Sequence, residues 1–354
     1  MRTDLGFKRI ATEEAFGTKE LMKAYRDLLA RKGSDDIGFN SLMGYYLTNP
    51  SERTRAVAAR LEDLGQRRID DMDATGIAMQ ILSITSPGVQ VFGADQAVGL
   101  ARSANDELAA AIAAHPTRYA GLAAIAPQNP QAAAKELERA VTKLGLKGAI
   151  ENSHTQGEYL DDPKFWPIFE AIEALGVPLY IHPTTPSPQM IQPFLPRALD
   201  AAIFGFACET GLHVLRMIVA GVFDRFPRLQ LVLGHLGEGL PYWLYRIDFM
   251  HAGIVRSNRS PGARPLQRKP SEVLRDNVHY TTSGMCWEPA VMFVHGLMGA
   301  ERVMYAMDYP YQVVAEEVAA MDALPLAPEE LAAFYAGNAE RVFGLAPGPI
   351  VTAR

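Results

Sequence analysis

Three side chains with metal-ligand chemistry, Glu13, His182 and Asp308, each stand at the end of a separate apolar run. Two carboxylates and one imidazole form a mixed oxygen and nitrogen set that suits Mn²⁺, Zn²⁺ or Fe²⁺. No cysteine is suitably placed beside them, which argues against a structural zinc site of the thiolate type. Three protein ligands also leave coordination positions open, as a catalytic ion requires. We therefore predict one catalytic divalent metal ion, although each residue taken alone could be a satisfied polar group or a helix N-cap.

A further histidine, His235, stands in the segment GHLGE, three residues before Glu238. It is either an additional ligand or, in the interpretation we favour, a base or proton shuttle just outside the ligand set. Glu238 would then fix the orientation of the imidazole ring. A buried, neutral imidazole is the remaining alternative. The other histidines that lie away from strand ends are not expected to be catalytic: His115, His213, His251, His279 and His295.

The elements that position these residues are short apolar strands alternating with helical stretches. The expected strands are residues 8–13, 78–84, 119–125, 147–152, 177–182, 230–235, 278–283 and 302–308. Helical periodicity marks residues 57–75, 94–114, 131–144, 163–175 and 211–225. Such alternation predicts parallel βαβ units, and eight of them favour a closed (β/α)8 TIM barrel. An open doubly wound sheet would normally carry a glycine-rich phosphate loop after its first strand, where this sequence reads EAFGTKE.

A barrel explains why the polar residues fall where they do. The carboxyl ends of all its strands face one mouth, so residues at different strand ends come together there. Polar groups stand at five of the predicted strand ends: Glu13 with Glu14, Asn152 with His154, His182, His235 and Asp308. Because a buried charge must be paired or bound to a metal ion, the set as a whole indicates a metal site.

Two long segments follow strand ends and depart from the simple repeat, residues 17–56 and the Pro-rich residues 183–210. Long loops at the carboxyl ends of barrel strands build the active-site face, so we predict that both are active-site insertions. Residues 252–270 are predicted to form an exposed basic loop with a solvated or subunit-contact role. The tail 346–354 is predicted to extend beyond the barrel. No linker or internal repeat divides the sequence, so we predict a single domain over residues 1–354.

The composition excludes several other classes of protein. Hydrophobic residues make up 48% of the 354 residues, enough for a large core, and the formal net charge is −6. Nucleic-acid binding needs a basic face, so no nucleic-acid partner is expected. There is no run of about 18 apolar residues and no signal-peptide core, so no membrane association is expected. With only two cysteines there is no disulfide framework, and we expect a cytoplasmic enzyme.

Several sequence blocks resemble the decarboxylase branch of the amidohydrolase superfamily, the branch of aminocarboxymuconate semialdehyde decarboxylase. The blocks are TEEAF (12–16), YIHP (180–183), GHLGEGLPYW (234–243) and MYAMDYPY (304–311). Further blocks resemble most the members that decarboxylate 5-carboxyvanillate: SPGVQ (86–90), NSHTQGEYLD (152–161), AAIFGFACETGLH (201–213) and LPYWLYRIDFMH (240–251). The likeness runs over nearly the whole chain. It implies a cytoplasmic barrel enzyme of lignin-derived aromatic catabolism that releases CO2 without a redox step.

The resemblance also implies roles for individual residues. Glu13, His182 and Asp308 match metal ligands, with Mn²⁺ as the expected ion, Zn²⁺ as the alternative and no organic cofactor. Arg53 matches an arginine that holds the substrate carboxylate. The other implied substrate contacts are Arg246, Tyr46, Thr85, Phe206 and Tyr311. The partner is expected to be a small aromatic carboxylate. The chain is expected to form a homodimer or homotetramer in which Arg246 serves the site of a neighbouring subunit.

One departure from the superfamily pattern bears on the chemistry. Many members carry His-x-His at the end of the first strand, but residues 13 to 15 here are Glu13, Glu14 and Ala15. Residues 13 and 15 share a strand face, and alanine binds no metal ion. We therefore expect a decarboxylase in which Asp308 protonates the ring carbon and His235 relays the proton. The alternatives are decarboxylation of γ-resorcylate or a dihydroxybenzoate, a metal-dependent hydrolase on this fold, and a non-catalytic metal-binding barrel.

Overall fold

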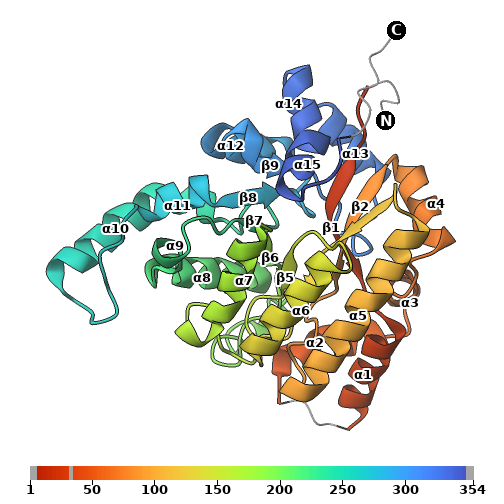
Figure 1. Ribbon diagram of the computed structural model, residues 1–354, viewed down its shortest axis with the longest axis horizontal. Coiled ribbons are helices and arrows are strands. Elements are labelled where there is room, and N and C mark those ends of the chain that lie inside the picture. The colour runs from red at the N-terminus through yellow and green to blue at the C-terminus, as the bar shows by residue number, and fades with distance from the viewer. Residues whose placement is uncertain (1–5, 32–34, 348–354) are drawn as a thin grey trace.

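Parallel strands and helices alternate through the computed structural model, which describes residues 6–31 and 35–347 (Figure 1). The strands are β1 (Ile10–Phe16), β2 (Met79–Ile84), β3 (Tyr119–Gly121), β4 (Ala123–Ala124), β5 (Ala149–Glu151), β6 (Leu179–Ile181), β7 (Leu231–Leu233), β8 (Val278–Thr281) and β9 (Val303–Met304). They form two parallel groups with the orders β1-β2-β3 and β4-β5-β6-β7-β8-β9. Every neighbouring pair of strands is parallel, as alternation with helices predicts.

The helices of the first half are α1 (Lys19–Ala30), α2 (Ile37–Thr48), α3 (Glu52–Leu61), α4 (Gln66–Thr75), α5 (Ala94–Ala114), α6 (Pro130–Thr142) and α7 (Trp166–Leu175). Those of the second half are α8 (Gly205–Val219), α9 (Val222–Arg225), α10 (Leu244–Ser257), α11 (Pro270–Asp276), α12 (Glu288–Met298), α13 (Ala315–Asp322), α14 (Pro328–Ala332) and α15 (Asn338–Val342). Side-chain oxygens of Thr18, Asp36, Ser51 and Asn129 accept backbone N–H bonds where α1, α2, α3 and α6 begin.

The two groups of strands join through Leu122, the single residue between β3 and β4. Its N–H donates to the carbonyl of Leu82 in β2 at 2.9 Å. The next residue, Ala123, donates instead to Gly148 just before β5, at 2.8 Å. β3 and β4 are therefore one strand that passes from one neighbour to the other, within the predicted strand 119–125.

The last strand meets the first. Thr12 N donates to Tyr305 O at 3.1 Å, and Ala15 N donates to Tyr309 O at 2.6 Å. The carboxylate of Glu14 accepts the N–H of Met307 at 2.9 Å across the same seam. Eight parallel strands thus close into a (β/α)8 barrel, and the predicted fold is confirmed.

Several predicted boundaries were wrong. The predicted helix 57–75 is two helices, because the side chain of Asp63 accepts the N–H of Gly65 at 2.8 Å and turns the chain between α3 and α4. The predicted insertion 17–56 is largely helical, since it contains α1, α2 and the start of α3. Residues 183–204 do form a long connection, but α8 begins at Gly205 instead of 211.

Two more expectations concern the last third of the chain. The predicted basic loop 252–270 is helical up to Ser257, because α10 continues through that residue; the helix extends away from the barrel (Figure 1). In the predicted tail 346–354, residues 348–354 lie outside the described residues. Among the described residues, the structure shows no helix that is both long and apolar enough to cross a bilayer.

Candidate metal centre

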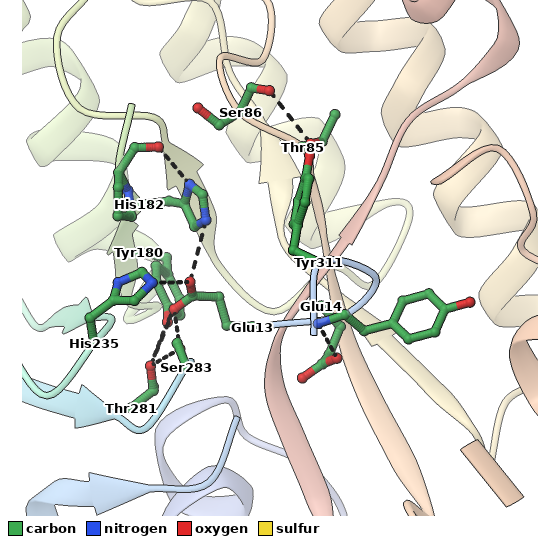
Figure 2. Close-up of polar contacts among 12 residues, drawn as sticks. Glu13, Glu14, Thr85, Ser86, Tyr180, His182, His235, Thr281, Ser283 and Tyr311 are labelled. Atoms are coloured by element: carbon green, nitrogen blue, oxygen red, sulfur yellow. Dashed lines mark hydrogen bonds and ion pairs between the residues drawn. The ribbon is translucent and has the colours of Figure 1, made fainter. Parts of the chain in front are cut away.

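The structure brings Glu13, His182 and Asp308 together at the mouth of the barrel. One ligand atom from each lies within 4.8 Å of the ligand atoms of the other two. Glu13 lies inside β1 and not at its end, His182 directly follows β6, and Asp308 lies four residues beyond β9. Glu13 and Glu14 point to opposite sides of β1, as strand alternation predicts (Figure 2). Glu13 and His182 are buried, and Asp308 is half-buried.

The two carboxylate oxygens of Glu13 have different surroundings. Oε2 accepts hydrogen bonds from the hydroxyls of Tyr180, of Ser283 at 2.5 Å and of Thr281 at 3.2 Å (Figure 2). Oε1 is buried and has no hydrogen-bond partner among the described residues. A buried oxygen without a partner costs about 1–3 kcal/mol, so this atom needs a partner that the protein itself does not supply.

His182 shows which kind of partner fits. Its Nδ1 lies 2.8 Å from the carbonyl of Pro183, which only accepts, so Nδ1 carries the donated proton. In the neutral ring, Nε2 then has a lone pair, and it lies 3.3 Å from Glu13 Oε1. Two acceptors facing each other are stabilised by a cation between them. The donor set of one imidazole nitrogen and two carboxylates therefore fits a divalent metal ion.

A glycine makes room for the Glu13 carboxylate. Gly234 follows β7, and a Cβ atom on it would lie 2.5 Å from Glu13 Oε2. Any side chain there would displace the carboxylate from the three hydroxyls that hold it. The sequence pattern gave Gly234 no role, because a glycine before a histidine looks like a simple turn.

His235 lies beside the candidate ligands. Its Nδ1 lies 2.8 Å from Glu238 Oε1, and its Nε2 lies 3.9 Å from Glu13 Oε1. Residues 235–239 all have left-handed φ angles between 50° and 89°, which turns the chain so that the side chains of His235 and Glu238 meet. Asp308 also has a left-handed φ, of 70°. Non-glycine residues in this region cost about 1–3 kcal/mol each and concentrate at functional sites.

The protein groups alone set an uneven distribution of protons in this cluster. Burial opposes ionisation of Glu13, but the nearby imidazoles of His235 and His182 outweigh it and lower its pKa to about 2. Burial lowers the pKa of His235, but Glu238 and Glu13 raise it to about 10. Burial, together with the charge of Glu13, raises the pKa of Asp308 to about 7. A negative and a positive group thus lie side by side, next to a carboxyl group that titrates near neutral pH.

A pocket opens onto these residues. Its lining comprises His182, His235 and Asp308 together with Leu42, Tyr46, Ser86, Ala202, Phe206 and Tyr311. Tyr46 comes from α2 in the first predicted insertion, and Ala202 from the second. The rings of Tyr46 and Tyr311 meet edge to face at 5.2 Å between centroids. Thr85 lies behind this wall, its hydroxyl 2.5 Å from that of Tyr311 (Figure 2). Aromatic rings thus form part of the wall of the pocket beside two of the candidate ligands.

The two predicted arginines lie apart. Arg53 is exposed near the start of α3, close enough to the pocket that its charge opposes the burial-driven rise in the pKa of Tyr46. Arg246 is exposed on α10 and is absent from the lining of this pocket. Neither arginine lines the pocket, and only the charge of Arg53 acts on a residue of its wall, so both predicted substrate contacts stay predictions.

Sequence reasoning missed the groups that hold Glu13 in place. Tyr180 and Thr281 lie inside β6 and β8, where tyrosine and threonine are common for their β-propensity alone. His154, one of the polar residues at predicted strand ends, proves to be structural, with Nε2 3.1 Å from Thr185 O and Nδ1 accepting Gly157 N. Its position after a strand was the same as that of His182, so only the contacts distinguish the two.

Comparison with known proteins identifies the family. The model of the amidohydrolase family matches residues 48–345. The chain belongs to the amidohydrolase family. This amidohydrolase is 33% identical to γ-resorcylate decarboxylase of a Polaromonas species over 345 residues. The aligned region covers 95% of this chain and 98% of that protein.

Solved structures are similar over nearly the whole chain of this amidohydrolase. 5-Carboxyvanillate decarboxylase of Novosphingobium aromaticivorans, solved with manganese and 4-hydroxy-3-methoxy-5-nitrobenzoic acid, is 50% identical with a TM-score of 0.95, covering 98% of each chain. 5-Carboxyvanillate decarboxylase of Sphingomonas paucimobilis is 42% identical with a TM-score of 0.90, covering 96% of this chain and all of the other. The predictions of a carbon–carbon lyase and of a divalent metal cofactor are confirmed at the level of the family.

Proposed function

We propose that this amidohydrolase is a metal-dependent, non-oxidative decarboxylase of an ortho-hydroxy aromatic acid, and that 5-carboxyvanillate, converted to vanillate and CO2, is its substrate. The observation that carries the proposal is the buried Oε1 of Glu13, which has no hydrogen-bond partner within residues 6–31 and 35–347. It lies beside His182 and Asp308, which line a pocket whose wall includes the rings of Tyr46, Phe206 and Tyr311. That combination offers a site for one divalent ion with space for a flat, chelating ligand.

The chemistry requires a proton donor at the ring. Direct loss of CO2 would leave a carbanion in the ring plane, where the π-system gives no stabilisation. Protonation of the carbon that bears the carboxylate avoids this: a C–H bond forms, the C–CO2 bond then breaks, and its electron pair restores the aromatic ring. An ionised ortho hydroxyl stabilises the non-aromatic intermediate, so the site must bind that oxygen and the carboxylate together.

The residues of the pocket divide these tasks. A divalent ion held by Glu13, His182 and Asp308 would supply Lewis acidity toward the phenol and carboxylate oxygens of the substrate. Asp308 is proposed to deliver the proton to the ring carbon. His235, held by Glu238 at 2.8 Å, is placed to keep or return that proton. Arg53 is proposed to hold the carboxylate through its guanidinium fork.

Two features favour the methoxylated substrate and the lyase reaction. The 5-carboxyvanillate decarboxylase of Novosphingobium is 50% identical to this chain, against 33% for the γ-resorcylate decarboxylase of Polaromonas. Ala15, two residues after Glu13, offers no ligand for a second ion, which counts against a two-metal hydrolase. γ-Resorcylate remains the second candidate substrate.

We also propose that the chain acts as a homodimer or homotetramer. Large apolar side chains are exposed around the start of α10: Tyr242, Trp243, Tyr245 and Phe249, which are 74%, 49%, 82% and 59% exposed. A contiguous surface of this kind marks a protein contact. Arg246 belongs to the same helix and would reach a pocket only in a neighbouring subunit. Sedimentation-velocity analysis tests the assembly, and a purely monomeric species at micromolar concentration would contradict it.

One assay tests the function. The protein, chelated and then reloaded with Mn²⁺ or Zn²⁺, is incubated with 5-carboxyvanillate, γ-resorcylate and an aromatic lactone, and the products are separated by chromatography. We expect vanillate and CO2 from 5-carboxyvanillate, and loss of activity on chelation. For γ-resorcylate we expect kcat/KM to be at least about tenfold lower, which is the effect of one missing substrate contact. Lactone hydrolysis without CO2 release, or full activity after rigorous chelation, would disprove the proposal.

A further inference from the structure

Arg68 of α4 is an arginine with no exposed surface, buried behind the candidate metal centre. Its guanidinium donates to the carbonyls of Asp63, Ala15 and Arg60 at 3.0, 2.7 and 3.2 Å, and to Gln80 Oε1 at 3.1 Å. Within the described residues, these acceptors are all neutral oxygens. A buried guanidinium is costly unless every donor is satisfied, so this position is built around the arginine.

The first connection runs from Arg68 to β1. Nη2 of Arg68 donates to the carbonyl of Ala15, two residues after Glu13. Gln80 Oε1 accepts the hydrogen bond from Arg68 Nη1, and the Gln80 amide donates in turn to Glu14 Oε2 at 3.4 Å. The strand that carries Glu13 is therefore held on its far side by the guanidinium, through one direct contact and one through an amide.

The second connection runs from Arg68 to the segment that carries Asp308. The guanidinium carbon lies 4.3 Å from the centre of the Tyr309 ring, which is the geometry of a cation–π contact. The Tyr309 hydroxyl donates to Asp71 Oδ2 at 2.9 Å, and its backbone N–H donates to Glu14 Oε2 at 3.2 Å. Tyr309 directly follows Asp308, whose left-handed backbone persists only if its surroundings hold it.

One side chain thus contacts both edges of the seam across which the candidate ligands face each other. Glu13 belongs to the first strand and Asp308 to the segment after the last one. Few backbone hydrogen bonds cross this seam, and Glu14 closes part of it with its carboxylate. Any relative shift of the two edges would change the distance between the two carboxylates.

We propose that Arg68 is a positioning residue that fixes the separation of Glu13 and Asp308 by clamping the Ala15 carbonyl and the Tyr309 ring together. Arg68 touches neither the ion nor the substrate. The inference rests on the proposed metal site, since it assigns a function to the distance between two of its ligands. It predicts that the guanidinium governs metal affinity and turnover, with little effect on substrate binding.

The test compares Arg68→Met and Arg68→Lys with wild type and with Arg9→Met. Arg9 is a matched control, because it is also a buried arginine next to β1, but it pairs with Asp322 at the opposite end of the strand. Chelated protein is titrated with Mn²⁺, and free ion is counted by electron paramagnetic resonance. Turnover is then measured at saturating Mn²⁺, and melting temperature by circular dichroism.

Arg68→Met is expected to weaken Mn²⁺ affinity by about 10–100-fold and to lower kcat at saturating Mn²⁺ while KM changes less than about twofold. Arg68→Lys should lie in between, since an ammonium replaces only part of the planar fork. Arg9→Met should lower the melting temperature but leave Mn²⁺ affinity within about twofold of wild type. A folded Arg68→Met that binds Mn²⁺ as wild type does would overturn the inference.

A second pair of variants keeps the test decisive if Arg68→Met fails to fold. Tyr309→Phe retains the ring under the guanidinium and should bind Mn²⁺ nearly as wild type does, whereas Tyr309→Leu removes the ring and should weaken binding by about tenfold or more. Equal Mn²⁺ affinities for the two variants would overturn the clamp. Wild-type protein that binds no Mn²⁺ would instead overturn the proposed function, and this inference with it.

Discussion

Buried charged groups are paired at one end of the barrel and left partly unpaired at the other. At the end where the strands begin, Arg9 donates to both carboxylate oxygens of Asp322 at 2.8 Å, so the two charges satisfy each other. At the end where the strands finish, Glu13 Oε1 is buried and accepts no hydrogen bond from the part of the chain that the structure describes, and His235 and Asp308 have left-handed backbones. The first end is built for stability, and the second keeps unsatisfied and strained groups that a ligand would relieve.

The largest effect is expected from removing the proposed proton donor at the end of the barrel where the strands finish. Asp308→Asn retains a ligand oxygen but has no carboxylic proton, so kcat should fall by about 10³-fold at equal Mn²⁺ occupancy. Occupancy is measured by metal analysis of the same samples. Full decarboxylation by a variant with unchanged metal content would show that Asp308 is not the acid.

Two glycines provide a matched contrast between the ends. Gly234→Ala would place a Cβ 2.5 Å from Glu13 Oε2, and Gly148→Ala would place one 2.6 Å from the carbonyl of Pro178 before β6. Both substitutions should lower the melting temperature. Only Gly234→Ala should weaken Mn²⁺ affinity, by about 10-fold or more, because only it displaces a candidate ligand. The contrast between the ends would be lost if Gly148→Ala impaired Mn²⁺ binding equally.

The pH dependence of the free energy of unfolding tests the end of the barrel where the strands begin. Burial, with the charges of Arg302 and Arg341, lowers the pKa of His279 from 6.5 to about 3. Between these pH values the unfolded chain binds a proton that the folded chain does not. Stability should therefore fall as the pH drops below 6.5, by up to about 1.4 kcal/mol per pH unit from this group.

His279→Gln removes this titration and should flatten the pH dependence of urea unfolding between pH 4 and 6.5. His115→Gln, at the end of α5 outside the barrel, serves as the control for loss of an imidazole. Parallel pH profiles for His279→Gln and wild type would show that His279 is not held neutral by the fold.

The smallest expected effect concerns Ser86 in the pocket lining. Its hydroxyl is buried and has no hydrogen-bond partner among residues 6–31 and 35–347, so removing it breaks no contact of the free protein. If it donates to a substrate oxygen, Ser86→Ala should raise KM by about 2–10-fold and leave Mn²⁺ affinity and melting temperature unchanged. An unchanged KM would mean that the hydroxyl does not contact the substrate.

The sequence was enough to predict the barrel and the meeting of Glu13, His182 and Asp308. Both predictions depend on a regular pattern, since apolar strands recur with helices between them and end in polar residues at one mouth. The same pattern placed α5 at residues 94–114, where the structure has it. Regular elements are predictable because local periodicity decides them.

The rest depends on contacts between distant residues, which no local pattern records. The break between α3 and α4 comes from one side-chain hydrogen bond of Asp63, and the left-handed turn at residues 235–239 has three non-glycine residues. Tyr180 and Thr281 look like ordinary strand residues until Glu13 is seen beside them. Arg246 was predicted as a substrate contact from its motif alone; it is exposed in the first turn of α10 and outside the lining of the pocket, so this role stays a prediction.

The seam between β1 and β9 has a consequence for how the molecule matures during synthesis. Glu14 and Met307 face each other across the seam although they are 293 residues apart. A nascent chain on the ribosome therefore holds Glu13 and His182 long before the segment with Asp308 emerges. The candidate ion-binding site is complete only once the segment with Asp308 has been made, so chains that end before it would lack the third candidate ligand.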